Sequence, residues 1–105
     1  MHSNISIDQE QIRAFSSRWQ TTEFALFGSV LREDFGPESD VDVLLTFAPE
    51  RWPTGLEVVR MERELSALFG RPVDLFTRRG VEQSHNARLR AEILTTAEVI
   101  YVQAA

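Results

Sequence analysis

Three segments of the chain repeat their apolar residues at the three-to-four-residue spacing of an amphipathic helix. The first follows a Ser-x-x-Gln capping box at Ser6, and the second follows a Thr-x-x-Glu capping box at Thr54 and stops at Gly70 and Pro72. The third pattern predicts one helix from about Val81 to Leu94. The apolar stripes are Ile12, Phe15 and Trp19; Val58, Met61, Leu65 and Leu68; and Leu89 with Ile93.

Four shorter segments have the composition or the alternation of β-strands: Glu23–Phe27, Asp40–Phe47, Val73–Phe76 and Glu98–Val102. The second is the strongest, because apolar side chains occupy every other position from residue 41 to residue 47. Strands and helices alternate along 105 residues, with no linker or internal repeat. We therefore expect one domain over residues 1–105, of the α/β or α+β class, with about four strands flanked by helices.

The composition of the chain limits the kinds of functional site that it can form. The chain has no cysteine and no lysine, and its 11 arginines face 16 acidic residues for a net charge of −5. Disulfides, thiolate metal sites and lysine chemistry are therefore excluded, and any phosphate contact must use arginine, backbone N–H groups or a metal. An acidic chain is a poor stand-alone partner for nucleic acid. No apolar run reaches the roughly 20 residues of a membrane span, and residues 1–5 lack a signal-peptide pattern, so we expect a cytoplasmic protein.

Three aspartates are the candidate metal ligands. Asp40 and Asp42 are spaced i, i+2 on a predicted strand, so they project from the same face. Asp74 lies between Val73 and Leu75 in another strand, and it faces the same way if those two neighbours face the core. Carboxylate oxygens suit a hard divalent cation such as Mg²⁺. Three carboxylates would repel one another, and a metal would relieve that repulsion.

A second candidate feature is the Gly28-Ser29 turn, which follows a strand and precedes a predicted helical segment at Val30–Phe35. A glycine lets the backbone approach a ligand closely, and free N–H groups at a helix start suit a phosphate. Arg32 lies one helical turn later and can supply a cation. A phosphate cradle beside clustered carboxylates is typical of phosphoryl or nucleotidyl transfer.

Each feature also has a simpler explanation when it is taken alone. The Gly-Ser turn can be only a turn, and the aspartates can be solvated residues of a structural domain without catalysis. Trp52, in a loop between two prolines, can be a packing anchor or can stack on a base or a partner. Arg78 and Arg79 fit a solvated turn, or contacts with a nucleotide phosphate or a partner protein. The order and spacing of the aspartates and the Gly-Ser turn favour the functional interpretation.

Two segments resemble the signature of the polymerase-beta-like nucleotidyltransferase superfamily, and within it the minimal nucleotidyltransferases: residues 27–32 (FGSVLR) and 37–45 (PESDVDVLL). The resemblance extends over nearly the whole chain, including residues 88–94 and 99–101. It implies a mixed sheet with flanking helices. It also implies Asp40, Asp42 and Asp74 as catalytic ligands of two Mg²⁺ ions. Members commonly have glycine after the arginine, where this chain has Glu33, a carboxylate that would repel a triphosphate.

The resemblance implies a function as well. Members are often antitoxins paired with HEPN-domain ribonuclease toxins, so the expected reaction moves AMP from ATP to a tyrosine of the toxin within a hetero-oligomer. Gly28, Ser29, Arg32 and Ser39 are the residues expected to bind the nucleotide. Two alternatives stay open. One is an antitoxin that binds without turnover, and the other is a small-molecule nucleotidyltransferase of the aminoglycoside type, which would need an additional helical region.

Overall fold

The computed structural model of the protein describes residues 8–28 and 40–103. Within these ranges the elements follow one another as α1 (Gln9–Trp19), β1 (Thr21–Phe27), β2 (Val41–Phe47), α2 (Gly55–Phe69), β3 (Val73–Thr77), α3 (Arg78–Glu82), α4 (Ala87–Thr96) and β4 (Glu98–Val102). The strands form one mixed sheet in the order β3-β2-β1-β4. β1 is antiparallel to β2 and β4, whereas β2 and β3 are parallel. The predicted fold class and its four strands are confirmed.

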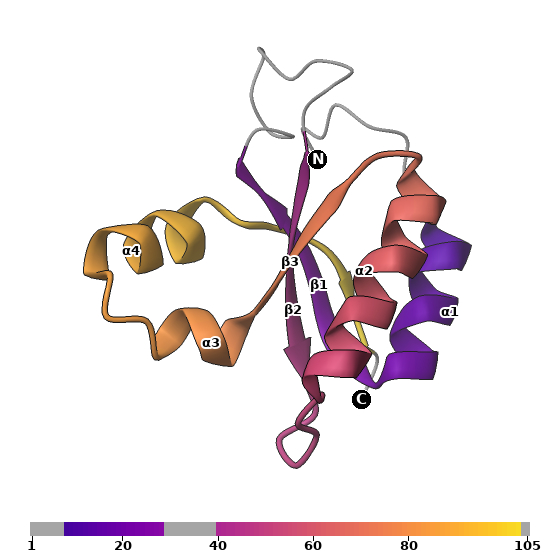
Figure 1. Cartoon of the computed structure of the whole chain (residues 1–105), viewed down its shortest axis with the longest axis horizontal. Coiled ribbons are helices and arrows are strands. Elements are labelled where there is room, and N and C mark those ends of the chain that lie inside the picture. Colours follow the sequence, from indigo (N-terminus) through magenta and orange to yellow (C-terminus); the bar gives the residue numbers. More distant parts are fainter. Residues whose placement is uncertain (1–7, 29–39, 104–105) are drawn as a thin grey trace.

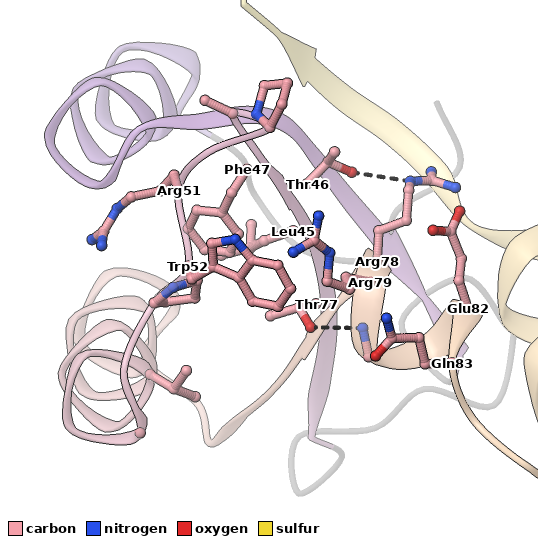
Figure 2. Close-up of a pocket in the computed structure, with 16 residues that line it drawn as sticks. Leu45, Thr46, Phe47, Arg51, Trp52, Thr77, Arg78, Arg79, Glu82 and Gln83 are labelled. Atoms are coloured by element: carbon pink, nitrogen blue, oxygen red, sulfur yellow. Dashed lines mark hydrogen bonds between the residues drawn. The ribbon is translucent and has the colours of Figure 1, made fainter.

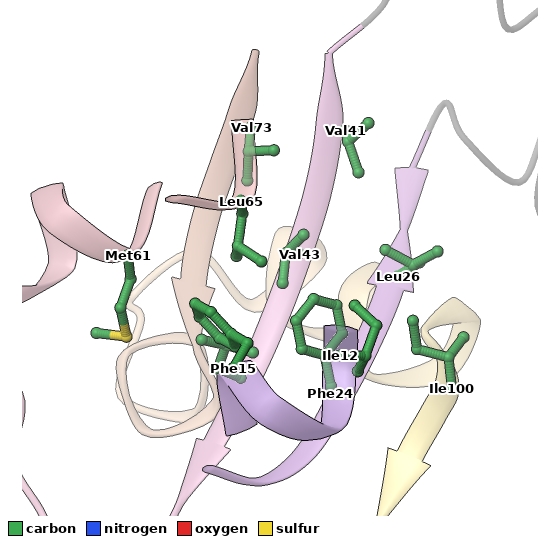
Figure 3. Packing of buried hydrophobic residues seen from close by; sticks show 11 residues of the cluster. Ile12, Phe15, Phe24, Leu26, Val41, Val43, Met61, Leu65, Val73 and Ile100 are labelled. Atoms are coloured by element: carbon green, nitrogen blue, oxygen red, sulfur yellow. The ribbon is translucent and has the colours of Figure 1, made fainter. Parts of the chain in front are cut away.

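The main core lies between the sheet and the helices α1 and α2, which cover one of its faces (Figures 1 and 3). The predicted alternation of β2 is confirmed, because Val41, Val43 and Leu45 are buried in this core. The stripe of α2 is confirmed too, with Met61 and Leu65 fully buried. A smaller cluster on the other face contains Ala25, Phe27, Leu44, Val81 and Ile93. The sheet thus has a heavily covered face and a more open one, on which α3 and α4 lie.

The helix ends show which capping predictions were right. Thr54 and Glu57 form the predicted capping box, and Gly70 ends α2 in the left-handed conformation at φ +68°. The predicted start of the first helix at Ser6 is wrong, because α1 begins at Gln9 and its N-cap is Asp8. The Asp8 carboxylate accepts hydrogen bonds from two backbone N–H groups. A charged carboxylate at this position also interacts favourably with the helix dipole.

The single helix predicted from about Val81 to Leu94 is wrong, because two helices occupy the segment. Polar side chains bind the backbone at the break and compete with helical hydrogen bonds. The N–H of Asn86 donates to the Ser84 hydroxyl, and the Asn86 side chain accepts from the N–H of Leu89 to start α4. α3 begins directly after β3, so Arg78 and Arg79 belong to a helix rather than to a solvated turn.

The loop between β2 and α2 carries Trp52, which is not a packing anchor. Its side chain is 63% exposed, and the guanidinium of Arg79 lies 3.4 Å from the centre of its ring. Nothing in the described ranges resembles a membrane span, since no helix there is both long and apolar enough.

Candidate active site

Asp42 and Asp74 are direct neighbours across the parallel pair of β2 and β3. Their flanking residues, Val41 and Val43 on β2 and Val73 and Leu75 on β3, pack into the main core. Because side chains alternate along a strand, both aspartates face the more open side of the sheet. Neighbouring strands lie about 4.8 Å apart, so the two carboxylates stand side by side.

Asp40 lies immediately before β2, two residues from Asp42, and is exposed. Among the described residues, no three histidine or acidic side chains form a group that could hold a metal ion. Of the three predicted aspartates, the structure thus aligns Asp42 with Asp74, and Asp40 lies two residues before Asp42 in the chain. Ser29, Arg32 and Ser39 lie outside the described residues, as do Glu33 and the helical segment predicted at Val30–Phe35.

Gly28 follows β1 directly and contacts the carboxylate of Asp42. It has φ +74°, and a Cβ atom built on it would lie 2.3 Å from Oδ2 of Asp42. A side chain at this position would both strain the backbone and displace the aspartate. Phe27, one residue earlier, is the register partner of Asp42 across the antiparallel pair. The glycine is thus needed here to give the Asp42 side chain its space.

A cavity of about 490 Å³ opens beside these groups, between the sheet and α4. Its wall combines aromatic and aliphatic side chains with two carboxylates: Phe27, Gly28, Asp42, Phe76, Leu89, Glu92, Ile93 and Thr96. The rings of Phe27 and Phe76 pack edge to face at 5.1 Å. Pockets of this size with a mostly apolar lining and a few polar groups suit a small organic ligand.

Sequence reasoning missed the α4 wall of this cavity. The i, i+4 spacing of Leu89 and Ile93 indicated core residues, but only Ile93 is buried. Leu89 is 43% exposed and lines the cavity instead. One available signal was Glu92, a carboxylate placed between these two apolar positions on the same helix face.

A family model described as nucleotidyltransferase domain matches residues 9–97. The chain belongs to this family. The predicted enzyme class, a nucleotidyltransferase, is confirmed. The matched region includes β2 and β3, which bear Asp42 and Asp74, and Gly28, which follows β1.

Relatives of this nucleotidyltransferase narrow the family further. The protein adenylyltransferase MntA of Thermococcus cleftensis is 34% identical over 87 residues, which are 81% of this chain and 78% of the relative. A solved structure assigned to a minimal nucleotidyltransferase is 31% identical and has a TM-score of 0.61, with 88% of this chain and 95% of the other covered. The resemblance to minimal nucleotidyltransferases is confirmed.

Two solved complexes share the fold at lower identity. A toxin–antitoxin crystal structure with AMP-PNP has a TM-score of 0.71 at 17% identity, with 92% of this nucleotidyltransferase and 75% of that chain covered. A complex of tri-AMPylated Shewanella oneidensis HEPN toxin with MNT antitoxin has a TM-score of 0.63 at 18% identity, with 90% and 70% covered. At these identities the likeness concerns the fold alone.

Proposed function

We propose that this nucleotidyltransferase is the antitoxin of a HEPN/MNT pair and transfers AMP from ATP to a tyrosine hydroxyl of the HEPN ribonuclease toxin. The MntA relative carries the name protein adenylyltransferase, which supports AMP transfer to a protein. The AMPylated toxin in the Shewanella complex supports a toxin as acceptor. AMP-PNP in the related toxin–antitoxin structure supports ATP as the donor.

The observation that carries the proposal is the alignment of Asp42 with Asp74, together with the position of Asp42 and Gly28 in the wall of the α4 cavity. Two like charges about 5 Å apart repel by roughly 1 to 3 kcal/mol, depending on how much water reaches them. The glycine further ensures that no side chain competes with Asp42 for its position. An apolar cavity next to these carboxylates has the size and the walls to hold a nucleoside.

The donor set fits Mg²⁺, because aligned carboxylate oxygens are the ligands that this cation accepts in phosphoryl-transfer sites. Asp42 and Asp74 would hold it, with Asp40 as the further ligand that the sequence predicts. Bound there, Mg²⁺ would neutralise charge on the phosphates during transfer. Ser29 and Arg32 follow Gly28 in the sequence, and Ser39 precedes Asp40; in this proposal they contact the triphosphate.

The reaction balances without a further reactant. The tyrosine oxygen forms a bond to the α-phosphorus of ATP, the bond from that phosphorus to the bridging oxygen of the β-phosphate breaks, and pyrophosphate leaves. The tyrosine proton passes to the Asp74 carboxylate, which is exposed and stands on the same face as Asp42. The remaining catalytic contribution is positioning of the two reactants and neutralisation of charge.

Mass spectrometry of the toxin tests the proposal directly. A HEPN-domain toxin, sought in the reading frame next to that of this chain, is incubated with the protein, ATP and Mg²⁺, and its mass should rise by one or more AMP units at a tyrosine. The Asp40→Ala/Asp42→Ala double variant should leave the mass unchanged. If that variant still neutralises toxicity and the wild type gives no mass shift, the antitoxin acts by binding alone.

Thermal unfolding tests the nucleotide site without the toxin. A ligand that binds only the folded state raises the melting temperature. ATP and Mg²⁺ together should therefore stabilise the protein more than either does alone. Arg32→Ala should reduce the stabilisation more than Ser29→Ala, because it removes a charge rather than a hydroxyl. Equal stabilisation by ATP in the presence of a chelator would contradict the role of the metal.

A further inference from the structure

A second cavity, of about 450 Å³, lies at the opposite end of β2 from the aspartates. It is lined from the ends of β2 and β3, the loop before α2, and α3, and Figure 2 shows it. Asp42 and Thr46 are four residues apart on β2, so the two cavities are separated by about 13 Å of strand. The nucleotide chemistry proposed above makes no use of this end of the sheet.

Three arginines lie in the wall of this cavity, among mostly apolar and uncharged residues. Arg51, Arg78 and Arg79 line it, against a single acidic residue, Glu82. Arg51 is held by two hydrogen bonds to Glu57, at 3.1 and 2.7 Å, and Arg78 donates to the Thr46 hydroxyl at 3.0 Å. Arg78 also pairs with the Glu23 carboxylate, at 3.5 Å, so two of the three arginines already have a carboxylate partner, and an anionic ligand would bind at the third.

Arg79 is the cation best placed to receive that ligand. Its guanidinium stacks on the Trp52 ring, 3.4 Å from the ring centre, and within the described residues it makes no ion pair. Stacking leaves the edge of a guanidinium, which carries its N–H donors, available for a carboxylate. Because the ring already holds the side chain in place, binding an anion would cost little further conformational entropy.

The surroundings of the cavity favour a protein over a small molecule. Trp52 and Leu56 are each 63% exposed, and Val59, one turn further along α2, is exposed as well. A mononucleotide would leave most of this apolar surface in water. A protein segment that covers it would gain from its burial, and exposed tryptophan beside arginine is the composition typical of binding hot spots.

We propose that the cavity of Trp52 and Arg79 is a docking site for an acidic segment of a partner protein. A glutamate or aspartate carboxylate binds the edge of Arg79, and an adjacent apolar side chain packs on Trp52 and Leu56. The segment would be held about 13 Å away from the carboxylates of the transfer site. Such separation lets a partner be held at one end of the sheet while its acceptor residue reaches the other.

Tryptophan fluorescence measures this binding, because the chain has two tryptophans and only Trp52 lines the cavity. In a Trp19→Phe background the emission comes from Trp52 alone. The probes are N-acetylated octapeptides that alternate leucine or phenylalanine with glutamate, and matched peptides with glutamine. The acidic peptides should change the emission saturably and bind at least tenfold more tightly than the glutamine peptides. High salt should weaken the binding of the acidic peptides.

Arg79→Gln should weaken the binding of the acidic peptides at least tenfold. Arg63→Gln is the matched control, since it removes the same charge from an exposed position on α2 outside the cavity. Circular dichroism establishes that both variants are folded. Three results would each overturn the proposal: no saturable change with any acidic peptide, equal binding by Arg79→Gln, or saturation of the Trp52 signal by AMP instead of peptide.

A second experiment uses the toxin in place of the peptides, and its interpretation rests on the proposed function. Arg79→Gln should raise the KM for the toxin at least fivefold, with kcat and the KM for ATP unchanged. An unchanged KM for the toxin would contradict docking at this site. Absence of AMP transfer by the wild type would instead count against the proposed function, and the peptide measurements would still decide on the docking site.

Discussion

The two ends of the β2-β3 pair differ in the charged side chains that the fold brings together. At one end, Asp42 and Asp74 place like charges side by side, and the nearby Gly28 has a backbone that L side chains rarely adopt. At the other, Arg51 and Arg78 have hydrogen-bonding partners, and Arg79 lies on an aromatic ring. The repulsion between the two carboxylates opposes folding, whereas the paired and stacked arginines at the other end support it. Like charges that the fold holds together indicate a site maintained for chemistry.

Asp42→Asn should have the largest effect on function. It removes a charge at the acidic end but keeps the shape of the side chain. AMP transfer should fall by roughly two to three orders of magnitude, the scale seen when a group that stabilises transition-state charge is lost. The melting temperature without metal should be unchanged or slightly higher, because repulsion with Asp74 is relieved.

The matched change at the basic end is Arg79→Gln, for which transfer at saturating toxin should stay near the wild-type rate. Rates of AMP transfer and melting curves of both variants test the contrast. Transfer by Asp42→Asn within a few-fold of the wild type would remove Asp42 from the catalytic set.

A pair of glycine variants separates backbone strain from damage to the site. Gly28 and Gly70 have similar left-handed φ angles of +74° and +68°, but of the two only Gly28 would bring an added Cβ against another atom, Oδ2 of Asp42. Gly70→Ala should cost about 1 kcal/mol of unfolding free energy and leave transfer intact. Gly28→Ala should cost more, about 2 kcal/mol, and reduce transfer at least tenfold. Urea unfolding and transfer rates measure both, and equal transfer by the two variants would refute the link to Asp42.

The sequence predicted those features that depend on local pattern. Alternation in β2 identified the buried face, and the Thr54–Glu57 capping box and Gly70 marked the ends of α2. The alignment of Asp74 with Asp42 required one assumption, that the two strands are neighbours, which they are. These features follow from the period of side chains along an element and from the chemistry of its caps.

Features that depend on contacts between residues distant in the chain could not be predicted from the sequence. The break near Asn86 was missed because no glycine or proline marks it in residues 82–86, while side-chain hydrogen bonds interrupt the helix. The stacking of Arg79 on Trp52 joins residues 27 positions apart, so no local pattern indicates it. The Gly28 backbone was expected to approach a phosphate, and its contact with Asp42 is visible only once β1 and β2 are paired.

The walls of the α4 cavity offer a smaller test. Ile93 is buried against the sheet, whereas Leu89 is 43% exposed in the cavity. Ile93→Ala should destabilise the protein by about 2 to 4 kcal/mol. Leu89→Ala should cost under about 1 kcal/mol and yet weaken the stabilisation by ATP and Mg²⁺ several-fold, if the cavity holds the nucleoside. Chemical denaturation measures the loss of stability in each variant, and melting curves with ATP and Mg²⁺ measure the loss of nucleotide binding. Unchanged stabilisation by ATP in Leu89→Ala would show that the nucleoside does not bind in this cavity.

The smallest expected effect concerns the pH dependence of the basic end. The hydrogen bond from Arg51 lowers the pKa of Glu57 from its ordinary value of 4.5 to about 2, and the backbone N–H of Thr54 adds to the shift. Because the pKa is lower in the folded state, the charged carboxylate stabilises the fold fully above pH 4.5. This contribution is lost as the pH falls towards about 2.

Glu57→Gln should therefore lower the melting temperature by a constant amount, on the order of 2 °C, above about pH 5. The difference from wild type should shrink steadily below that pH. Glu50→Gln, which removes the same charge at an exposed position, is the control. A difference between wild type and Glu57→Gln that stays constant down to about pH 3 would show that the Arg51–Glu57 pair does not stabilise this end of the sheet through its charge.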